Sequence, residues 1–316
     1  MAIKVAINGF GRIGRNVLRA ILESGRQDIV VVAINDLADA ASNARLLKRD
    51  SVHGTFRGDV SVDGDHIIVD GQRIRVTAER DPAKLPHKEL NVDIAFECTG
   101  IFTTKEKASA HLTAGAKRVL VSAPCDGADK TIVYKVNHET LTADDIIVSN
   151  GSCTTNALAP VAKVLHDLFG IERGYMTTIH AYTGDQPTLD TMHKDLYRGR
   201  AAALSMIPTS TGAAKALGLV LPALKGKLDG SSIRVPTPNV SVVDLKVVAG
   251  RDVTVEEINK ALVSTDLNHI AASSTAALPQ TQVVDGKLAR VLTWYDNEWG
   301  FATRMADTAL VMSKLI

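Results

Sequence analysis

Cys153 is the residue best placed to act as a nucleophile. It lies in the polar run Ser149-Asn150-Gly151-Ser152-Cys153-Thr154-Thr155-Asn156, after a segment that predicts a strand and before one that predicts a helix. We therefore expect the thiol at a helix N-terminus, where free backbone N–H groups favour the thiolate. A buried, unreactive cysteine is the alternative interpretation.

The thiol also needs a partner, and His180 is the candidate. It follows the predicted strand 175–179 and precedes the turn-rich segment 181–187, so its side chain can reach into a site. A helix terminus contributes roughly 0.3 to 1 kcal/mol, which lowers a cysteine pKa of about 8.5 by less than one unit. A protonated imidazole within hydrogen-bonding distance is expected to supply the remaining stabilisation. A histidine that only packs is the alternative.

A glycine motif near the start predicts a nucleotide-binding turn. Gly9-Phe10-Gly11-Arg12-Ile13-Gly14 directly follows the first predicted strand and opens the first predicted helix. Gly9 permits the tight turn, Gly11 lets a pyrophosphate approach the backbone, and Gly14 lets the helix and strand pack closely. The anion would lie at the helix N-terminus. A merely structural glycine turn is the alternative.

Asp36 ends the second predicted strand and indicates which dinucleotide binds. It follows Gly14 by about 20 residues, which suits the carboxylate that accepts hydrogen bonds from the adenosine ribose. A 2′-phosphate at this ribose would meet the carboxylate at close range, and residues 37–39 offer no arginine to neutralise it. The sequence therefore predicts NAD rather than NADP.

Composition sets the broad class of protein. The chain has 316 residues, 45% of them hydrophobic and 22% charged, and its formal net charge is +1. These values suit a folded protein of roughly two domains, without a long-range field that would attract nucleic acid or anionic lipid. The chain lacks a long apolar run and begins directly with a strand pattern, so we expect no membrane association and a cytoplasmic location. Three cysteines, at 98, 125 and 153, match neither a disulfide framework nor a metal site, so no metal is expected.

The order of the predicted elements indicates an α/β fold with two domains. In the first half, near-continuous apolar strands alternate with helices, which favours a Rossmann-type doubly wound parallel sheet, with hairpins inserted between 50 and 80. One helix is expected over 104–114. The later strands are longer and more alternating, which favours an α+β catalytic domain with a mixed or antiparallel sheet. We predict domains 1–150 and 151–301, and a C-terminal helix, 302–316, that completes the first.

Six motifs follow one another along nearly the whole chain. They are NGFGRIGR at 8–15, SCTTN at 152–156, HAYTGDQ at 180–186, IPTSTGAAK at 207–215, RVPTPNVSVVDL at 234–245 and WYDNEWG at 294–300. In this company and order they resemble phosphorylating glyceraldehyde-3-phosphate dehydrogenase. The resemblance implies a homotetramer of glycolysis that oxidises D-glyceraldehyde 3-phosphate to 1,3-bisphosphoglycerate with NAD and inorganic phosphate.

The resemblance also implies roles for individual residues. Cys153 would attack the aldehyde, and His180 would activate the thiol and take the hydroxyl proton as a thioester forms. The substrate phosphate would bind Thr183 and Arg234, and the incoming phosphate would bind Ser152, Thr154, Arg198, Thr211 and Gly212. Cofactor contacts would come from Gly9, Gly11, Arg12, Ile13, Gly14, Asp36, Arg80, Ser122 and Asn297. The loop 182–203 would cross a subunit interface.

The chain departs from the family pattern at a few positions. The connection around 260–266 is shorter by roughly 18 residues, which we expect to affect surface, packing or assembly before chemistry. An alanine, a cysteine, a proline and a tyrosine that are usual in the family are replaced by Gly151, Ala157, Met192 and Phe301. The proline that Met192 replaces often accompanies strict NAD preference in the family.

Two other functions stay open. One is a related dehydrogenase of a phosphorylated aldehyde, such as erythrose 4-phosphate, with the same thiol and cofactor. The other is an NAD-binding interaction or RNA-associated protein that has lost catalysis. Its support is the basic cluster Lys194, Arg198 and Arg200, but the near-neutral net charge speaks against it. We therefore expect no specific nucleic-acid partner.

Overall fold

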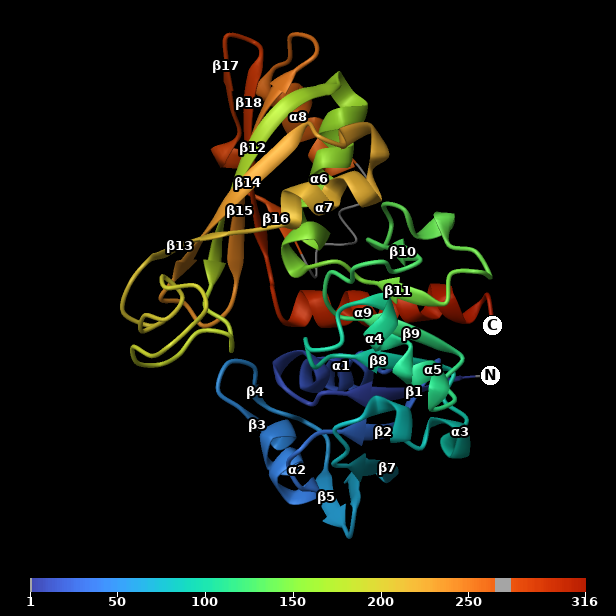
Figure 1. Cartoon of the computed structure of the whole chain (residues 1–316). Coiled ribbons are helices and arrows are strands. Elements are labelled where there is room, and N and C mark those ends of the chain that lie inside the picture. Colours follow the sequence, from blue (N-terminus) through green and yellow to red (C-terminus); the bar gives the residue numbers. More distant parts are fainter. Residues whose placement is uncertain (1, 265–273) are drawn as a thin grey trace. The chain divides into compact units, whose positions relative to one another are not determined.

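The computed structural model describes residues 2–264 and 274–316 and divides them into two compact units (Figure 1). The first unit contains the chain up to Tyr134 together with His138–Gly151 and Ala302–Ile316. The second contains Lys135–Asn137 and the described residues of Ser152–Phe301. Part of the shortened connection expected at 260–266 lies outside the described residues.

The sheet of the first unit has the order β10-β11-β9-β8-β1-β2-β7-β6-β5. Its neighbours from β10 to β7 pair in parallel, and β7, β6 and β5 pair antiparallel at one edge, where hairpins were predicted. β3 and β4 form a separate short hairpin. The strands are β1 (Ile3–Asn8), β2 (Ile29–Asn35), β3 (Arg49–Asp50), β4 (Gly54–Thr55), β5 (Val60–Asp63), β6 (His66–Val69), β7 (Gln72–Thr77), β8 (Ile94–Glu97), β9 (Arg118–Val121), β10 (Lys130–Thr131) and β11 (Ile147–Ser149).

The order in which strands are added to the sheet reverses between β1 and β8, which run parallel, and this reversal creates the place for a ligand. The chain moves from β1 to β2 towards one edge and from β8 to β9 towards the other. Right-handed crossovers then place the intervening helices on opposite faces of the sheet. At such a reversal the carboxyl ends of neighbouring strands diverge and leave a crevice. The helices of this unit are α1 (Arg12–Glu23), α2 (Ala40–Lys48), α3 (His87–Leu90), α4 (Lys105–Ala108), α5 (Ala110–Thr113) and α9 (Trp299–Ser313), with short 3₁₀ turns at Pro82–Lys84 and His138–Thr140. The first three residues of α9 belong to the second unit.

The central strands of this sheet are buried on both faces. Every residue of β8, β9 and β11 is buried, as is β1 from Val5 to Asn8. Apolar side chains therefore follow one another along these strands without alternation, as in parallel sheets covered by helices on both sides. The predicted Rossmann-type sheet is confirmed.

The helix expected over 104–114 is broken at Ser109. The structure has α4 up to Ala108 and α5 from Ala110, with Ser109 between them. The Ser109 hydroxyl donates a hydrogen bond to the carbonyl of Glu106 at 2.5 Å, and its N–H is bonded to Lys105. A serine that bonds to its own backbone competes with the regular helix, and the apolar pattern did not reveal this break.

The second unit has a mixed sheet in the order β13-β14-β12-β15-β18-β16, with β17 also paired to β18. The β12 and β14 strands run parallel, and the other neighbours run antiparallel. The predicted mixed sheet is confirmed. The strands are β12 (Ile171–Ala181), β13 (Ile207–Ser210), β14 (Leu228–Val235), β15 (Ser241–Ala249), β16 (Ser274–Ala276), β17 (Gln282–Val284) and β18 (Leu288–Tyr295).

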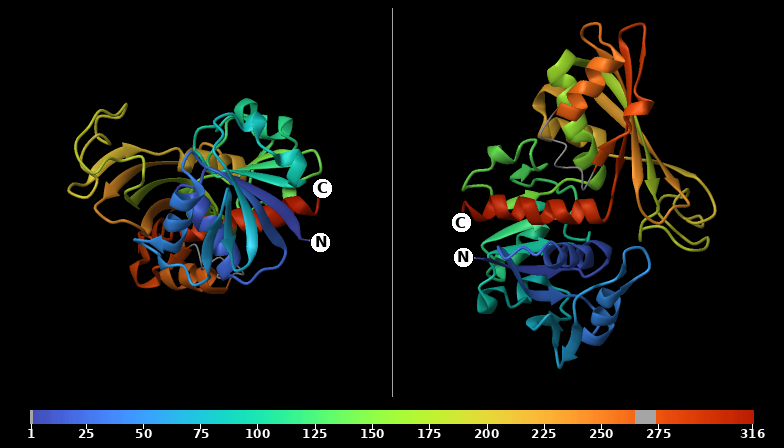
Figure 2. Two further views of the ribbon diagram at one scale, coloured as in Figure 1. Left: turned by 90° about the horizontal axis from the view of Figure 1, so that it is seen from below. Right: turned by 180° about the vertical axis from the view of Figure 1, so that it is seen from behind.

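Helices cover one side of this mixed sheet. The long helix α6 contacts β12, β15 and β18, and two further helices pack against α6 (Figure 2, right). Burial alternates along β15 and β18, so one face of each strand points to the helices. Within the described ranges, every helix is too short or too polar to cross a lipid bilayer. The helices are α6 (Cys153–Phe169), α7 (Ala213–Val220) and α8 (Val255–Ser264), with 3₁₀ turns at Pro222–Leu224 and Leu278–Gln280.

Candidate active site

A cavity of about 420 Å³ opens at the carboxyl ends of β1, β2 and β8 in the first unit. It therefore lies at the reversal of strand order, where doubly wound sheets bind nucleotides. The loops that follow the three strands supply most of its walls. Its lining residues are Asn8, Gly9, Gly11, Asn35, Asp36, Leu37, Glu79, Arg80, Cys98, Thr99, Ile101 and Phe102.

Three glycines shape the turn beside this cavity. Gly9 has φ +89°, and a Cβ there would lie 2.7 Å from the backbone nitrogen of Thr99. A Cβ on Gly14 would lie 2.1 Å from the carbonyl oxygen of Gly9, so only glycine lets α1 approach β1 this closely. Around Gly11, in contrast, no described atom lies within 4 Å of such a Cβ. The turn is thus tight on its protein side and open on the cavity side.

The N-terminus of α1 is suited to hold an anion. Its N-cap is Gly11, which has no side chain to accept hydrogen bonds from the first turn, and that turn contains no acidic residue. A helix start without a side-chain cap or an acidic residue suits a phosphate. The Arg12 guanidinium is paired with Asp50, and Ile13 and Gly14 continue the helix.

Asp36 is fixed at the rim of the cavity by the backbone around it. Its Oδ2 accepts a hydrogen bond from the N–H of Phe10 at 2.9 Å, and its Oδ1 accepts one from Ala38 at 3.2 Å. The carboxylate is thereby tied to the glycine turn, and Arg80 lines the same cavity. A glycine cradle that a Cβ would fill, an open helix N-terminus and a fixed carboxylate together fit a dinucleotide.

The two remaining predicted cofactor residues, Ser122 and Asn297, are not among the residues that line this cavity. Ser122 follows β9 in the first unit, where its N–H donates to Glu97 at 2.9 Å. Asn297 belongs to the second unit, where its Oδ1 accepts a hydrogen bond from the Ser241 hydroxyl at 2.8 Å. That bond orients the Asn297 amide.

The structure places Cys153 and His180 in contact. Cys153 opens α6, and Ser152 before it caps the helix by accepting a hydrogen bond from the N–H of Thr155 at 3.0 Å. His180 lies near the end of β12, and its Nε2 is 3.4 Å from Cys153 Sγ. A strand end and a helix start thus bring together two residues that the sequence separates by a helix and a strand.

The hydrogen bonds of His180 define which ring nitrogen carries the proton. Its Nδ1 lies 2.6 Å from the carbonyl oxygen of Ala181, which can only accept a hydrogen bond. Nη1 of Arg234 also lies 3.2 Å from Nδ1, but the shorter contact is with an oxygen that can only accept, so Nδ1 holds the proton and the lone pair of Nε2 faces the thiol. Arg234 lies opposite His180 in the parallel pairing of β12 with β14, and its Nη1 donates to the same carbonyl at 3.2 Å.

The structure corrects the expectation of a protonated imidazole at His180. Burial, followed by the charge of Arg234, lowers the pKa of His180 to about 4, so the ring is neutral near pH 7. Burial also raises the pKa of Cys153 above its usual value, although Arg234 and the hydrogen bonds at Thr154 oppose this effect. The pair is therefore a thiol beside a neutral base, and the nearby cation is Arg234.

Neither of the other cysteines competes for this role. Burial raises the pKa of Cys98 to about 12, and the charge of Glu97 acts in the same direction. Burial also raises the pKa of Cys125. Both thiols stay protonated at neutral pH, and in the described part of the chain neither contacts a histidine as Cys153 does.

Tyr295 holds the start of α6 against the sheet, and the sequence did not reveal its role. Its hydroxyl is 2.9 Å from the hydroxyl of Thr154 and 2.9 Å from that of Thr178. Its ring meets the edge of the His180 ring, with centroids 5.9 Å apart. Thr154, predicted to bind phosphate, is 4% exposed and turned to Tyr295.

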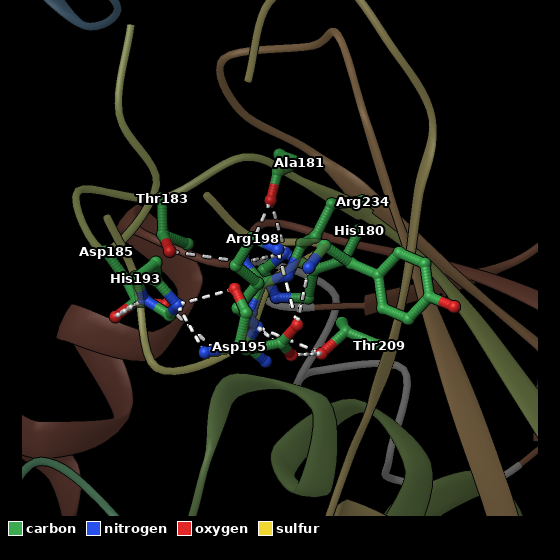
Figure 3. Close-up of polar contacts among 10 residues, drawn as sticks. His180, Ala181, Thr183, Asp185, His193, Asp195, Arg198, Thr209 and Arg234 are labelled. Atoms are coloured by element: carbon green, nitrogen blue, oxygen red, sulfur yellow. Dashed lines mark hydrogen bonds and ion pairs between the residues drawn. The ribbon is translucent and has the colours of Figure 1, made fainter. Parts of the chain in front are cut away.

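Arginines and hydroxyls gather beside His180 (Figure 3). The two residues predicted to hold the substrate phosphate are in contact, because Nη1 of Arg234 donates to Thr183 Oγ1 at 3.2 Å. Arg198, predicted to hold the other phosphate, donates from Nη1 to Asp185 Oδ2 at 2.9 Å and from Nε to Thr209 Oγ1 at 3.0 Å. Two cations near the reactive pair suit anionic ligands.

The remaining predicted phosphate residues lie at helix starts of the second unit. Gly212 is the N-cap of α7, and a Cβ there would meet no described atom within 4 Å. Beside it, the Thr211 hydroxyl accepts a hydrogen bond from the N–H of Ala213 at 3.2 Å. The Ser152 hydroxyl caps α6. Sequence reasoning missed Asp185, Asp195 and Thr209. Asp185 lies in the turn-rich segment 181–187 and Asp195 is placed three residues before Arg198, so both carried a turn signal, whereas Thr209 carried none.

Comparisons with known proteins agree with this arrangement. Two family models match: "Glyceraldehyde 3-phosphate dehydrogenase, NAD binding domain" over residues 3–105 and "Glyceraldehyde 3-phosphate dehydrogenase, C-terminal domain" over residues 152–263. Proteins named glyceraldehyde-3-phosphate dehydrogenase from Xanthobacter flavus and Cereibacter sphaeroides are 68% and 67% identical over 100% of both chains. One from Geobacillus stearothermophilus is 54% identical over 98% of both chains.

The alignment with the Xanthobacter flavus protein also bears on chain length. It runs over 334 positions, whereas this chain has 316 residues, so 18 aligned positions (334 less 316) carry no residue of this chain. This difference agrees in size with the shortened connection. Matches that cover both units, with identities well above half, show that the chain belongs to the glyceraldehyde-3-phosphate dehydrogenase family.

Proposed function

We propose that the chain oxidises D-glyceraldehyde 3-phosphate to 1,3-bisphosphoglycerate, with NAD as the hydride acceptor and inorganic phosphate as the acyl acceptor. The observation that carries this proposal is the contact of Cys153 Sγ with the unprotonated Nε2 of His180, at 3.4 Å. A thiol beside a neutral base can add to an aldehyde without being charged beforehand. Membership of the family selects the aldehyde.

Two residues carry the chemistry of this proposal. Cys153 Sγ bonds to the aldehyde carbon, and the thiol proton passes through His180 Nε2 to the aldehyde oxygen. That carbon then loses hydride while Nε2 takes the hydroxyl proton, which leaves a thioester on Cys153. NAD, when bound, supplies the acceptor for the hydride. A phosphate oxygen next attacks the thioester carbon, the carbon–sulfur bond breaks, the phosphate proton goes to sulfur, and His180 releases its proton to solvent.

Separate groups of residues bind the two anions and the cofactor. Arg234 and Thr183 hold the phosphate of the substrate, because their contact places a guanidinium and a hydroxyl beside His180. The incoming phosphate binds Ser152, Thr154, Arg198, Thr211 and Gly212. NAD binds the first unit through Gly9, Gly11, Arg12, Ile13, Gly14, Asp36, Arg80 and Ser122, and Asn297 contacts its carboxamide.

The assembly that fits this proposal is a homotetramer in the cytoplasm. Large apolar side chains stand exposed on one loop of the second unit: Leu189, Met192, Leu196, Tyr197, Leu204 and Met206. Such a concentration of exposed apolar surface is typical of a protein–protein interface. The three cysteines are free, which suits a reducing compartment. Light scattering of the purified chain checks the assembly, and a monomeric mass would contradict it.

The test of the proposed reaction is NADH production from glyceraldehyde 3-phosphate with phosphate present or omitted. We expect sustained turnover only with phosphate, and none from Cys153→Ser in either condition. Sustained oxidation without phosphate would instead indicate hydrolysis of the acyl group. Erythrose 4-phosphate in the same assay tests the related dehydrogenase, which would require a higher kcat/KM for that aldehyde. A chain that binds NAD but oxidises neither aldehyde would be an interaction protein.

A further inference from the structure

The guanidinium of Arg198 is held along two of its three nitrogens (Figure 3). Nε donates to Thr209 Oγ1 at 3.0 Å, and Nη1 donates to Asp185 Oδ2 at 2.9 Å. Nη2 has no hydrogen bond to a residue that the structure describes. The side chain is about a quarter exposed, so this nitrogen is the one left for a ligand.

Asp195 organises the Nε side of Arg198. Its Oδ2 accepts a hydrogen bond from Thr209 Oγ1 at 3.0 Å and lies 3.7 Å from Arg198 Nε. Because the Thr209 hydroxyl donates its only proton to Asp195, its lone pair is directed to Arg198. The hydroxyl therefore transmits the position of the carboxylate to the guanidinium.

The same carboxylate also shapes the backbone that carries Arg198. Its Oδ1 accepts hydrogen bonds from the N–H groups of Tyr197 at 2.9 Å and Arg198 at 3.3 Å. These bonds form a local turn in which an aspartate fixes the residues that follow it. Burial raises the pKa of Asp195, but the bonds from Thr209 and these N–H groups outweigh it, so the pKa is below its usual value and Asp195 is ionised near pH 7.

His193 joins the two carboxylates that flank Arg198. Its Nδ1 lies 2.9 Å from the backbone nitrogen of Asp195 and 3.0 Å from the carbonyl oxygen of the same residue. Nε2 faces Asp185 Oδ1 at 3.4 Å. Asp185, which holds Nη1 of Arg198, is thus held in turn by the same loop. Arg198 and Arg234 balance the charges of Asp185 and Asp195 here. This network therefore acts mainly by orienting the Arg198 guanidinium, and less by net attraction.

We propose that Asp195 is a positioning residue for the phosphate that attacks the thioester, acting through Thr209 on Arg198. This inference rests on the proposed function, because it requires phosphate as the acyl acceptor. Asp195 does not itself touch the phosphate. It fixes Nε and the local backbone so that Nη2 points to the ligand without further loss of side-chain freedom when phosphate arrives. Its loss should weaken phosphate use and leave formation of the thioester intact.

The experiment separates these two steps in Asp195→Asn and Thr209→Val. A rapid burst of NADH without phosphate reports thioester formation, and steady-state KM for phosphate reports the second step. We expect both variants to raise KM for phosphate about tenfold or more, since each disturbs a hydrogen bond to a charged group. Their burst rate should stay within about twofold of the unmodified chain, as the Cys153–His180 contact does not involve them.

Two matched variants serve as controls. Thr209→Ser keeps the hydroxyl and should restore KM for phosphate. Asp190→Asn removes an aspartate of the same loop that pairs with Arg200 at 3.0 Å and not with Arg198, so its KM should not change. An unchanged KM for phosphate in Asp195→Asn and Thr209→Val would overturn the inference. So would a fall in burst rate as large as the rise in KM. If the unmodified chain shows no burst and no need for phosphate, the proposed function itself fails.

Discussion

His180 presents a lone pair to Cys153, with Nε2 3.4 Å from Sγ, because its Nδ1 proton is committed to the Ala181 carbonyl 2.6 Å away. The residue that follows His180 in β12 thus selects the tautomer that can accept the thiol proton. Burial and then the charge of Arg234, which lies opposite in the sheet, lower the pKa of His180 and keep the ring neutral. Arg234 also stays close to the thiolate that forms. Base, tautomer and counter-charge all come from the ends of two paired strands.

The low pKa of His180 predicts an unusual pH dependence for thioester formation. With a pKa of about 4, the base stays unprotonated at pH 5.5, so the NADH burst rate should change less than about twofold between pH 7.5 and 5.5. A histidine of ordinary pKa, about 6.5, would instead lose about tenfold over this range. His180→Asn should lower the burst rate roughly 10²- to 10⁴-fold at every pH. A tenfold fall in the unmodified chain would contradict the neutral-base account.

Two glycines of one turn should respond in opposite ways to alanine. Gly14→Ala places a Cβ 2.1 Å from the Gly9 carbonyl oxygen. We therefore expect the free energy of unfolding to fall by about 1 to 3 kcal/mol, so that the variant unfolds at a lower urea concentration. Gly11→Ala meets no described atom within 4 Å and should retain stability, but its methyl group enters the space for the pyrophosphate. Urea unfolding and NAD titration by fluorescence measure both effects. Equal NAD affinity in Gly11→Ala and the unmodified chain would remove this turn from the cofactor site.

His87 should make the first unit sensitive to acid. It is 2% exposed, its Nε2 is 3.0 Å from His111 Nδ1, and burial, followed by the charge of His111, lowers its pKa to about 4. The unfolded chain has the ordinary pKa near 6.5 and binds the proton first, so stability is lost as pH falls between about 6.5 and 4.

The measurement is the free energy of urea unfolding at pH 7 and pH 4.5, compared with His87→Gln. The unmodified chain should lose about 2.5 kcal/mol more than the variant over this interval, whatever their difference at pH 7. Parallel pH dependences in the two proteins would show that His87 binds its proton equally in both states. Any loss of packing in the variant lowers both of its values and leaves the comparison intact.

Local patterns in the sequence predicted much of the fold. The glycine turn between β1 and α1 and the strand that leads to Asp36 depend on neighbouring residues, and the structure has them within one residue of the expected places. The Cys153 helix start was equally readable, because Ser152 is a strong N-cap. The broken helix at Ser109 was not, since its side chain bonds to a local carbonyl within an otherwise helical pattern.

The electrostatics of the site could not be predicted from the sequence. The neutral state of His180 depends on burial and on Arg234, which is distant in sequence and adjacent only because β12 and β14 pair in register. Likewise, the contact of Asp195 with Thr209 needs the loop to fold back against β13. Sequence reasoning therefore expected a charged imidazole, since it counted the helix terminus and omitted the cost of burial.

The most direct test of the central claim is the mass of the chain after mixing with glyceraldehyde 3-phosphate and NAD without phosphate. An acyl group on Cys153, located by peptide mapping and released when phosphate is added, is the predicted result. Cys153→Ser should gain no such mass. NADH formed in stoichiometric amount without any acyl group on Cys153, or an acyl group that phosphate does not remove, would contradict the account.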